Sequence, residues 1–243
     1  EILRCLVGSE MCIRDRCVKV PVAAVICAVI CVLTLAMAVY MFVCHEKFAF
    51  GKGNMMAGVH KHLVEHLEWD GNGQLLDIGC GAAALTIRCA KAFPKAKITA
   101  MDYWGAQWNY AKEQCERNAK LEGVSDHITF QKGDAAKLDY ADETFDAAVS
   151  NFVFHEVHSA KDKRDVVREA LRVVKKGGAF SFQDMFSQKA LYGDMEEFVR
   201  ILKEEGISEV HYIGNLEKKL DFIPGFVTTP WMISGMGIIY GKK

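Results

Sequence analysis

The stretch from Val20 to Cys44 constrains the fold of this chain more than any other segment, because its 25 residues include no charged side chain. As an α-helix it would be about 37 Å long, against about 30 Å for the hydrocarbon core of a bilayer. A secretory signal peptide has a shorter apolar core and a small-residue cleavage site, whereas this run ends in Tyr40-Met41-Phe42-Val43. A buried core helix would need a second apolar layer, and no later segment offers one. We therefore predict one transmembrane helix over residues 18–44, followed by a linker over residues 45–54.

Residues 1–16 differ from everything that follows them. The sequence EILRCLVGSEMCIRDR does not begin with Met, has no periodicity and resembles a translated sequencing-library adapter. We therefore predict that residues 1–16 are a non-native tail.

The charges beside the apolar run predict its orientation. With residues 1–16 set aside, Lys19 precedes the run, and Lys47, Lys52 and Lys61 follow it. By the positive-inside rule, this asymmetry predicts a single-pass membrane protein whose C-terminal domain is cytoplasmic. Counting the two arginines at the end of the tail would reverse the orientation.

The charge balance and the cysteines exclude several classes of protein. The chain has 30 Lys and Arg against 31 Asp and Glu, so we expect no nucleic-acid partner. Its nine cysteines form no CxxC motif, which argues against a zinc site or a disulfide framework. Residues 62–66 (HLVEH) match the HxxEH pattern of some zinc proteases, but no acidic ligand motif follows. We predict that no metal is bound.

Short apolar runs alternate with longer amphipathic segments in the rest of the chain. The predicted strands are Gln74–Ile78, Ile98–Met101, Ile128–Phe130, Phe145–Val149 and Ala179–Phe182. The predicted helices are Met55–Glu68, Ala83–Ala92, Gly105–Glu122, Asp162–Val174 and Asp194–Glu205. Lys175 to Gly178, two cations and two glycines, are typical of a helix C-terminus. Continuous hydrophobicity within the strands indicates that both faces are covered, so we predict an α/β domain with a mostly parallel sheet over residues 55–243.

The segment LLDIGCGAAAL, residues 75–85, predicts a ligand-binding turn. A buried strand is followed by Gly79 and Gly81, which let the backbone approach a ligand closely before a helix begins. Gly79, Gly81 and Ala84 form a GxGxxA pattern that also fits an NAD-binding loop. Asp77 favours a different ligand, because a carboxylate two residues before the first glycine can hold an ammonium group but would repel a pyrophosphate.

Two further acids follow the next predicted strands. Asp102 closes the second strand, where a carboxylate can accept hydrogen bonds from both ribose hydroxyls, and Asp134 follows the third, where it can accept from an adenine amine. Each acid alone is more typical of a turn. Three acids at successive strand ends lie at one edge of a parallel sheet, where open α/β sheets bind their ligands.

A set of motifs in this order resembles class I S-adenosylmethionine-dependent methyltransferases. The motifs are DIGCG, the acid of MDYWG, GDAAKL, FDAAVSNFVFHEV and ALRVVKKGGAF. They are most similar to the type-11 methyltransferase domains, which include quinone-biosynthesis C-methyltransferases. The match covers residues 54–186 in detail and continues loosely to Gly237–Tyr240. It implies a Rossmann-like fold with a mostly parallel seven-stranded sheet, helices on both faces and S-adenosyl-L-methionine as the cofactor.

The resemblance also implies roles for particular residues. Asp77, Gly79, Cys80 and Gly81 would border the methionine part of the cofactor. Asp102 would bind the ribose. The remaining expected cofactor contacts are Tyr103, Trp104, Asp134 and Ala135 at the adenine, and Asn151 beneath the sulfonium. Ala83 departs from the family pattern, because many members have a third glycine there.

His155 is the candidate catalytic residue. In the family the position of His155 and Glu156 faces the transferred methyl group. Methyl transfer mainly requires positioning, and a base is needed only when the nucleophile carries a proton. A residue that shapes the pocket or caps the next helix is the alternative role for His155.

The acceptor is expected to bind between Gln183 and Trp231. We interpret the aromatic residues of this segment as core more than as pocket; they are Phe186, Tyr192, Phe198, Tyr212, Phe222, Phe226 and Trp231. Three functions stay open. The first is a membrane-anchored methyltransferase, held by residues 20–44, that acts on a small-molecule or lipid acceptor. The others are a non-catalytic nucleotide- or NAD-binding module on a membrane anchor, and a family member that binds the cofactor but serves only in protein interaction.

Overall fold

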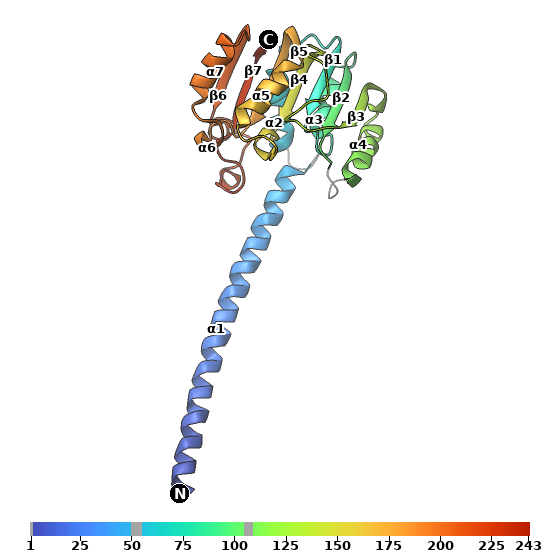
Figure 1. Ribbon diagram of the computed structural model, residues 1–243. Helices are drawn as coiled ribbons and strands as arrows, with labels where there is room; N and C mark the ends of the chain where they lie inside the picture. The colour runs from blue at the N-terminus through green and yellow to red at the C-terminus, as the bar shows by residue number, and fades with distance from the viewer. Residues whose placement is uncertain (1, 50–54, 105–108) are drawn as a thin grey trace. The chain divides into compact units, whose positions relative to one another are not determined.

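The computed structural model describes residues 2–49, 55–104 and 109–243, and the chain divides into two compact units between Gly53 and Asn54 (Figure 1). The predicted linker lies partly outside the described residues, at 50–54. So does the start of the predicted helix Gly105–Glu122, at 105–108.

The first unit is the helix α1, Ile2–Phe48. Its part from Pro21 to Phe48 is long and apolar enough to cross a membrane. The helix extends beyond the predicted 18–44 at both ends, so residues 45–48, expected in the linker, are helical instead. The sequence HEKF contains neither glycine nor proline, so it has no residue that would end a helix there.

The second unit is built on a sheet to which seven strands of the described residues contribute, in the order β3-β2-β1-β4-β5-β7-β6. The strands are β1 Gln74–Ile78, β2 Lys97–Asp102, β3 Ile128–Lys132, β4 Phe145–Asn151, β5 Val174–Asp184, β6 Glu209–Gly214 and β7 Gly237–Lys242. Strands β1 to β5 pair in parallel, and β7 lies antiparallel between β5 and β6. The predicted α/β fold with a mostly parallel seven-stranded sheet is confirmed.

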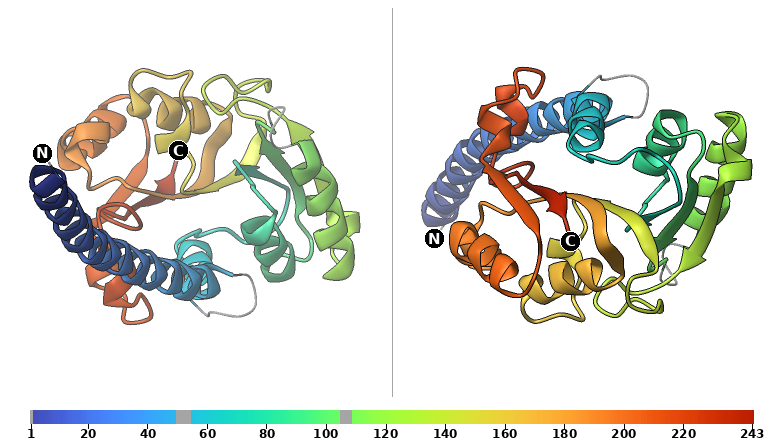
Figure 2. Two further views of the ribbon diagram at one scale, coloured as in Figure 1. Left: turned by 90° about the horizontal axis from the view of Figure 1, so that it is seen from below. Right: turned by 90° about the horizontal axis from the view of Figure 1, so that it is seen from above.

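Helices cover both faces of this sheet. They are α2 Met55–Glu65, α3 Ala84–Ala92, α4 Asn109–Leu121, α5 Lys163–Arg172, α6 Lys189–Tyr192 and α7 Met195–Glu204. Figure 2 shows α2 and α3 on one face and α5 and α7 on the other. Successive strand residues point to opposite faces, so β1 serves two cores: Leu75 packs with residues of α2, α3 and α4, and Leu76 with residues of α5 and α7.

The helix predicted over Met55–Glu68 ends at Glu65, and two other segments differ more from the sequence prediction. The helix predicted over Asp162–Val174 ends at Arg172, and Val174 already begins β5, where it pairs with Phe145. Residues 175–178, expected at a helix C-terminus, therefore belong to a strand. The reason is tertiary: Val174 is fully buried, the N–H of Gly177 donates to the carbonyl of Lys243, and the carbonyl of Gly178 accepts from the N–H of Lys243. Strand β6 was not located in the sequence, because it is a short edge strand that pairs only with β7.

The turn from β1 into α3 carries strain at Ala83. This residue has φ +69°, in the left-handed region. A side chain there costs about 1–2 kcal/mol relative to the right-handed conformation. The family pattern has a glycine at this position, and the backbone geometry explains the preference.

Candidate active site

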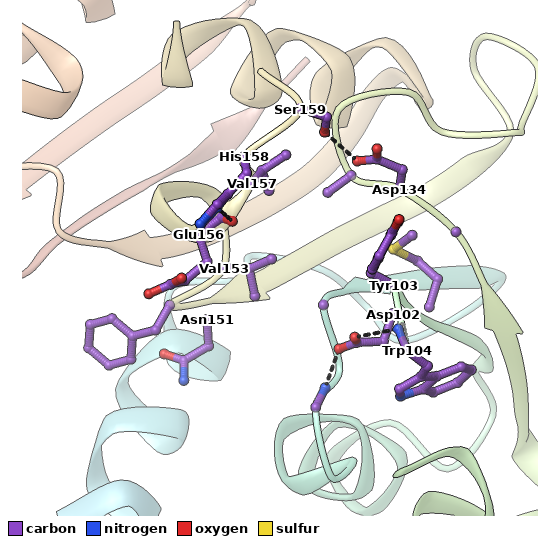
Figure 3. Close-up of a pocket in the computed structure, with 16 residues that line it drawn as sticks. Asp102, Tyr103, Trp104, Asp134, Asn151, Val153, Glu156, Val157, His158 and Ser159 are labelled. Atoms are coloured by element: carbon purple, nitrogen blue, oxygen red, sulfur yellow. Dashed lines mark hydrogen bonds between the residues drawn. The ribbon is translucent and has the colours of Figure 1, made fainter. Parts of the chain in front are cut away.

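A cavity of about 870 Å³ lies at the carboxyl ends of β1 to β4 (Figure 3). The residues that line it are Gly79, Gly81, Met101, Asp102, Tyr103, Trp104, Gly133, Asp134, Ala135, Asn151, Phe152, Val153, Glu156, Val157, His158 and Ser159. Figure 3 shows Asp102 and Trp104 on one side, with Asn151, Val153 and Glu156 across from them. Eight of the eleven residues predicted at the site line this cavity. The other three, Asp77, Cys80 and His155, do not.

Gly79 makes the turn after β1 possible. Its φ is +73°, and a Cβ at this position would lie 2.3 Å from the side chain of Val153. The N–H groups of Gly79 and Cys80 both donate to the carbonyl of Met101, at 2.8 and 3.0 Å. These hydrogen bonds hold the turn against the end of β2 and leave open the space that a larger side chain would fill.

Asp102 stands at the end of β2 and faces the cavity. Its Oδ2 accepts a hydrogen bond from the backbone N–H of Gly81 at 2.8 Å, and its Oδ1 accepts from the N–H of Trp104 at 3.3 Å. These two bonds orient the carboxylate, and each oxygen keeps further acceptor capacity. The arrangement suits a ligand that presents two hydroxyl groups.

Asp134 joins two loops across the cavity. Its Oδ1 accepts from the backbone N–H of Ala136 at 2.8 Å and from the Ser159 hydroxyl at 3.1 Å. The loop after β3 is thereby tied to the loop after β4. The N–H of Gly133 donates to the carbonyl of Asp102 at 2.9 Å, which links the same loop to β2.

Tyr103 and Trp104 provide aromatic surface beside these acids. Tyr103 is 62% exposed, whereas Trp104 is buried with φ +32°. The Trp104 Nε1 is buried without a hydrogen-bond partner among the described residues. An unpaired buried donor beside a cavity is consistent with a ligand that supplies the acceptor.

Asp77 lies beneath the turn, between β1 and α3. It is 1% exposed, and its Oδ2 accepts a hydrogen bond from the Thr86 hydroxyl at 2.5 Å. Burial raises the pKa of Asp77 to about 7, although the hydrogen bond from Thr86 opposes the shift. Its contact with an ammonium group stays a prediction.

Cys80 is buried in the same turn. Its hydrogen bond with Cys115 and its burial raise the pKa of the Cys80 thiol well above the ordinary range, so the thiol stays protonated. A cofactor contact from Cys80 also stays a prediction, and its backbone N–H is already used by Met101.

His155 lies behind the cavity wall. Its Nδ1 is 2.7 Å from Oδ1 of the buried Asp184, and its Nε2 is 3.3 Å from Oε1 of Glu156. Burial alone would lower the pKa of His155, but the hydrogen bond and charge of Asp184 outweigh it, so the pKa is raised. The catalytic role of His155 stays a prediction.

The segment after β4 supplies cavity residues that were not predicted, notably Phe152, His158 and Ser159, together with Glu156, which was expected near the methyl group. Phe152 has φ +57°, a strained conformation for a large side chain. The motif SNFVFHEV pointed to this loop, but which side chains face inward depends on the short 3₁₀ turn Phe154–Glu156, which the pattern does not reveal.

The residues present fit a nucleoside cofactor. The size of the cavity is in the range of small-molecule sites, and it offers two acids, of which Asp102 keeps free acceptor capacity, and aromatic surface. Among the described residues, no group of three or more His, Cys, Asp or Glu side chains is arranged to hold a metal ion.

Comparison with known proteins supports this interpretation. Residues 76–182 match the family model described as a methyltransferase domain. A sterol 24-C-methyltransferase of Aspergillus fumigatus is 30% identical over 168 residues, which is 69% of this chain and 42% of that protein. The chain therefore spans less than half the length of this curated relative.

Solved structures share the fold at lower identity. A geranyl diphosphate methyltransferase in complex with S-adenosylmethionine superposes with a TM-score of 0.59 at 16% identity, covering 81% of this chain and 93% of that one. The [4+2]-cyclase SpnF superposes with a TM-score of 0.60 at 18% identity, covering 81% and 84%.

Proposed function

The chain belongs to the class I S-adenosylmethionine-dependent methyltransferases, and from this premise we propose that it methylates an apolar, lipid-like acceptor at a membrane surface. The cofactor supplies the methyl group on its sulfonium. Asp102 would hold the ribose, while Tyr103, Trp104, Asp134 and Ala135 would surround the adenine. Asp77, Gly79, Cys80 and Gly81 would border the methionine part, and Asn151 the sulfonium.

The contribution of the protein to methyl transfer is mainly positional. The transfer is a displacement that needs an in-line approach of the acceptor to the methyl group. If the acceptor atom carries a proton, His155 is the proposed proton acceptor, since Asp184 orients its Nδ1 and stabilises the imidazolium. Glu156 lines the cavity next to it and would shape the acceptor side.

The observation that carries the choice of acceptor is a group of exposed aromatic side chains at the edge of the sheet where the cavity lies. Phe222, Phe226 and Trp231 are 38%, 40% and 69% exposed, and we call residues 222–231 the aromatic segment. They account for three of the five large apolar side chains exposed in the described part of the second unit; the other two are Tyr103 and Leu121. Such a concentration is typical of a binding surface or a membrane interface.

Topology places the aromatic segment at the edge of the sheet where the cavity lies. Strand β6 runs in the same direction as β5, because both are antiparallel to β7, so the connection from Gly214 to Gly237 leaves the carboxyl edge. A Cβ on Gly58 of α2 would lie 2.7 Å from the Phe222 ring, so the segment packs against α2. The sequence predicts that the aromatic residues between Gln183 and Trp231 belong more to the core than to a pocket. This prediction is correct for Phe186, Tyr192 and Phe198, which are fully buried, and wrong for the aromatic segment.

Two further observations support a membrane setting. The apolar part of α1 would hold the catalytic domain beside a bilayer, and the charge asymmetry favours the cytoplasmic side, where the cofactor is made. The curated relative named above is a sterol 24-C-methyltransferase, and a sterol is an apolar lipid.

A methyl-transfer assay on the full-length chain in nanodiscs tests this function. The chain is incubated with cofactor labelled in its methyl group, together with a membrane-lipid extract or a soluble-metabolite extract. We expect label in the lipid fraction and its loss in Asp102→Asn. Label confined to the soluble extract would reject the lipid-like acceptor, and binding of NAD without S-adenosylmethionine would favour the nucleotide-binding module.

The same assay tests the aromatic segment. We expect Trp231→Ser to raise the KM for the lipid acceptor about threefold to tenfold, in line with the loss of an aromatic anchor, and to leave cofactor affinity unchanged. Leu121→Ser is the matched control, since Leu121 is 77% exposed on α4. Equal effects of both variants would contradict a specific role for the aromatic segment.

A further inference from the structure

A buried histidine of α2 lies against the cavity residue Asn151. His60 is 4% exposed, and its Nδ1 accepts a hydrogen bond from Nε of Arg88 at 3.2 Å. Its Nε2 lies 3.4 Å from Nδ2 of Asn151. His60 thus connects α2 and α3 to the wall of the cavity at the end of β4.

Arg88 determines the tautomer of His60. A guanidinium Nε–H is always a donor, so the Nδ1 that faces it must be the unprotonated acceptor. Burial, followed by the charge of Arg88, lowers the pKa of His60 to about 4, so the ring is neutral near pH 7. A neutral imidazole with an unprotonated Nδ1 carries its hydrogen on Nε2.

The Nε2–H then determines the orientation of the Asn151 amide. A donor at His60 requires an acceptor opposite, so the amide oxygen of Asn151, rather than its nitrogen, must face His60. The orientation of Asn and Gln amides is assigned from their hydrogen-bond partners, and half a turn exchanges the two atoms. Asn151 then presents its nitrogen to Gln183, with which it shares a contact of 2.8 Å.

The same half turn of the Gln183 amide extends this series of hydrogen bonds. In the opposite orientation of its amide, Oε1 of Gln183 is buried without a partner among the described residues, and so is Nδ1 of His62. Turned, the Gln183 oxygen accepts from Asn151, and the Gln183 nitrogen takes the place of that oxygen on the side of His62, with which the Gln183 amide interacts. One consistent assignment removes the donor–donor contact at His60 and gives a partner to the buried Gln183 oxygen.

We infer that His60 is a positioning residue of the cofactor cavity: oriented by Arg88, its Nε2–H holds the amide oxygen of Asn151 toward α2 and directs a hydrogen-bond chain through Asn151 to Gln183. The inference rests on the proposed assignment of the cavity to S-adenosylmethionine. It makes α2 part of the cofactor site through a residue that does not line the cavity.

Nitrogen NMR of the full-length chain in detergent micelles tests the tautomer. With ¹⁵N in the histidine rings, correlation spectra distinguish Nε2–H from Nδ1–H, and His60→Gln assigns the signal of His60. We expect a neutral Nε2–H ring that does not titrate from about pH 8 to about pH 5.5, well below the ordinary range of histidine. An Nδ1–H ring, or protonation near the ordinary pKa, would overturn the inference.

Cofactor affinity tests the positioning role. Leucine at position 60 can make neither hydrogen bond, whereas glutamine can accept from Arg88 and donate to Asn151. We expect His60→Leu to weaken binding of S-adenosylmethionine about threefold to tenfold, and His60→Gln to stay within about twofold of the unchanged chain. Lys61→Leu, at a side chain that is 75% exposed, is the matched control and should change nothing.

The outcomes separate this inference from the proposed function. Equal losses in His60→Leu and His60→Gln, or no loss in either, would overturn the positioning role while cofactor binding itself stands. A chain with the expected tautomer that binds no S-adenosylmethionine would overturn both the positioning role and the function.

Discussion

At the scale of single residues, Asp102 is the most direct test of the cofactor site. Asp102→Ala removes the proposed acceptor for two ribose hydroxyls, and each charge-assisted hydrogen bond typically contributes about 1.5–3 kcal/mol. We expect cofactor affinity, measured by calorimetry, to fall at least about tenfold while circular dichroism shows a folded chain.

A second variant separates ligand contact from the support that Asp102 gives to the glycine turn. Asp102→Asn keeps an oxygen for the N–H of Gly81 but loses one acceptor, so its affinity should lie between those of Asp102→Ala and the unchanged chain. Asp126→Ala, at an exposed acid, should bind normally. An unchanged dissociation constant in a folded Asp102→Ala chain would remove Asp102 from the site.

Asp77 links the stability of the fold to pH. Its pKa is about 7 in the folded chain against an ordinary value of 3.8, because burial disfavours the charged form. An acid with a raised folded pKa stabilises the fold most below its unfolded pKa, and this contribution is lost as pH rises through the folded value. The loss falls between about pH 4 and about pH 7, at about 1.4 kcal/mol for each unit of pKa difference.

Asp77→Asn has no charge to bury, so its thermal midpoint relative to the unchanged chain should rise across this window. Comparing the two chains at several pH values cancels the contributions of other acids. Midpoint curves that stay parallel would show that Asp77 does not titrate in this range.

At the scale of elements, α5 shows how one side chain determines where a helix begins. Asp162 caps α5, and its Oδ1 accepts from the N–H of Arg164 at 2.9 Å. Asp162→Ala should lower the free energy of unfolding by about 1 kcal/mol, or the thermal midpoint by about 2–4 °C. Asp162→Asn keeps the cap and loses only the ion pair with Arg164, so it should retain most of the stability. A midpoint as low as that of Asp162→Ala would assign the effect to the ion pair.

At the scale of the whole molecule, the central prediction is the topology. A reporter that is active only in the periplasm, fused after Lys243 in a bacterial host, should be inactive, because the charges beside α1 favour a cytoplasmic domain. Leu33→Arg places a charge in the middle of the apolar run at a cost of about 2.5–3.5 kcal/mol, and should lower the membrane-bound fraction. Strong periplasmic activity would reject both the orientation and the function at the cytoplasmic face.

The sequence by itself determined the bounds of the central strands and which acids and glycines gather at one edge of the sheet. Strand β1 has the predicted bounds because a strand buried on both faces is a continuous apolar run. The acids Asp102 and Asp134 and the glycines Gly79 and Gly81 were predictable because parallel strands bring their carboxyl ends to one edge.

The tertiary structure decided what depends on contacts between distant segments. Edge strand β6 forms because it pairs with β7, and the start of β5 forms because Val174 pairs with Phe145 of β4. A short or glycine-containing segment has no local signal strong enough to predict a strand. The series of hydrogen bonds from Arg88 through His60 to Asn151 and Gln183 joins residues far apart in the sequence. Their hydrogen bonding is determined only when the fold buries them together. Burial, a property of the folded molecule, is also what raises the pKa of Asp77 and lowers that of His60.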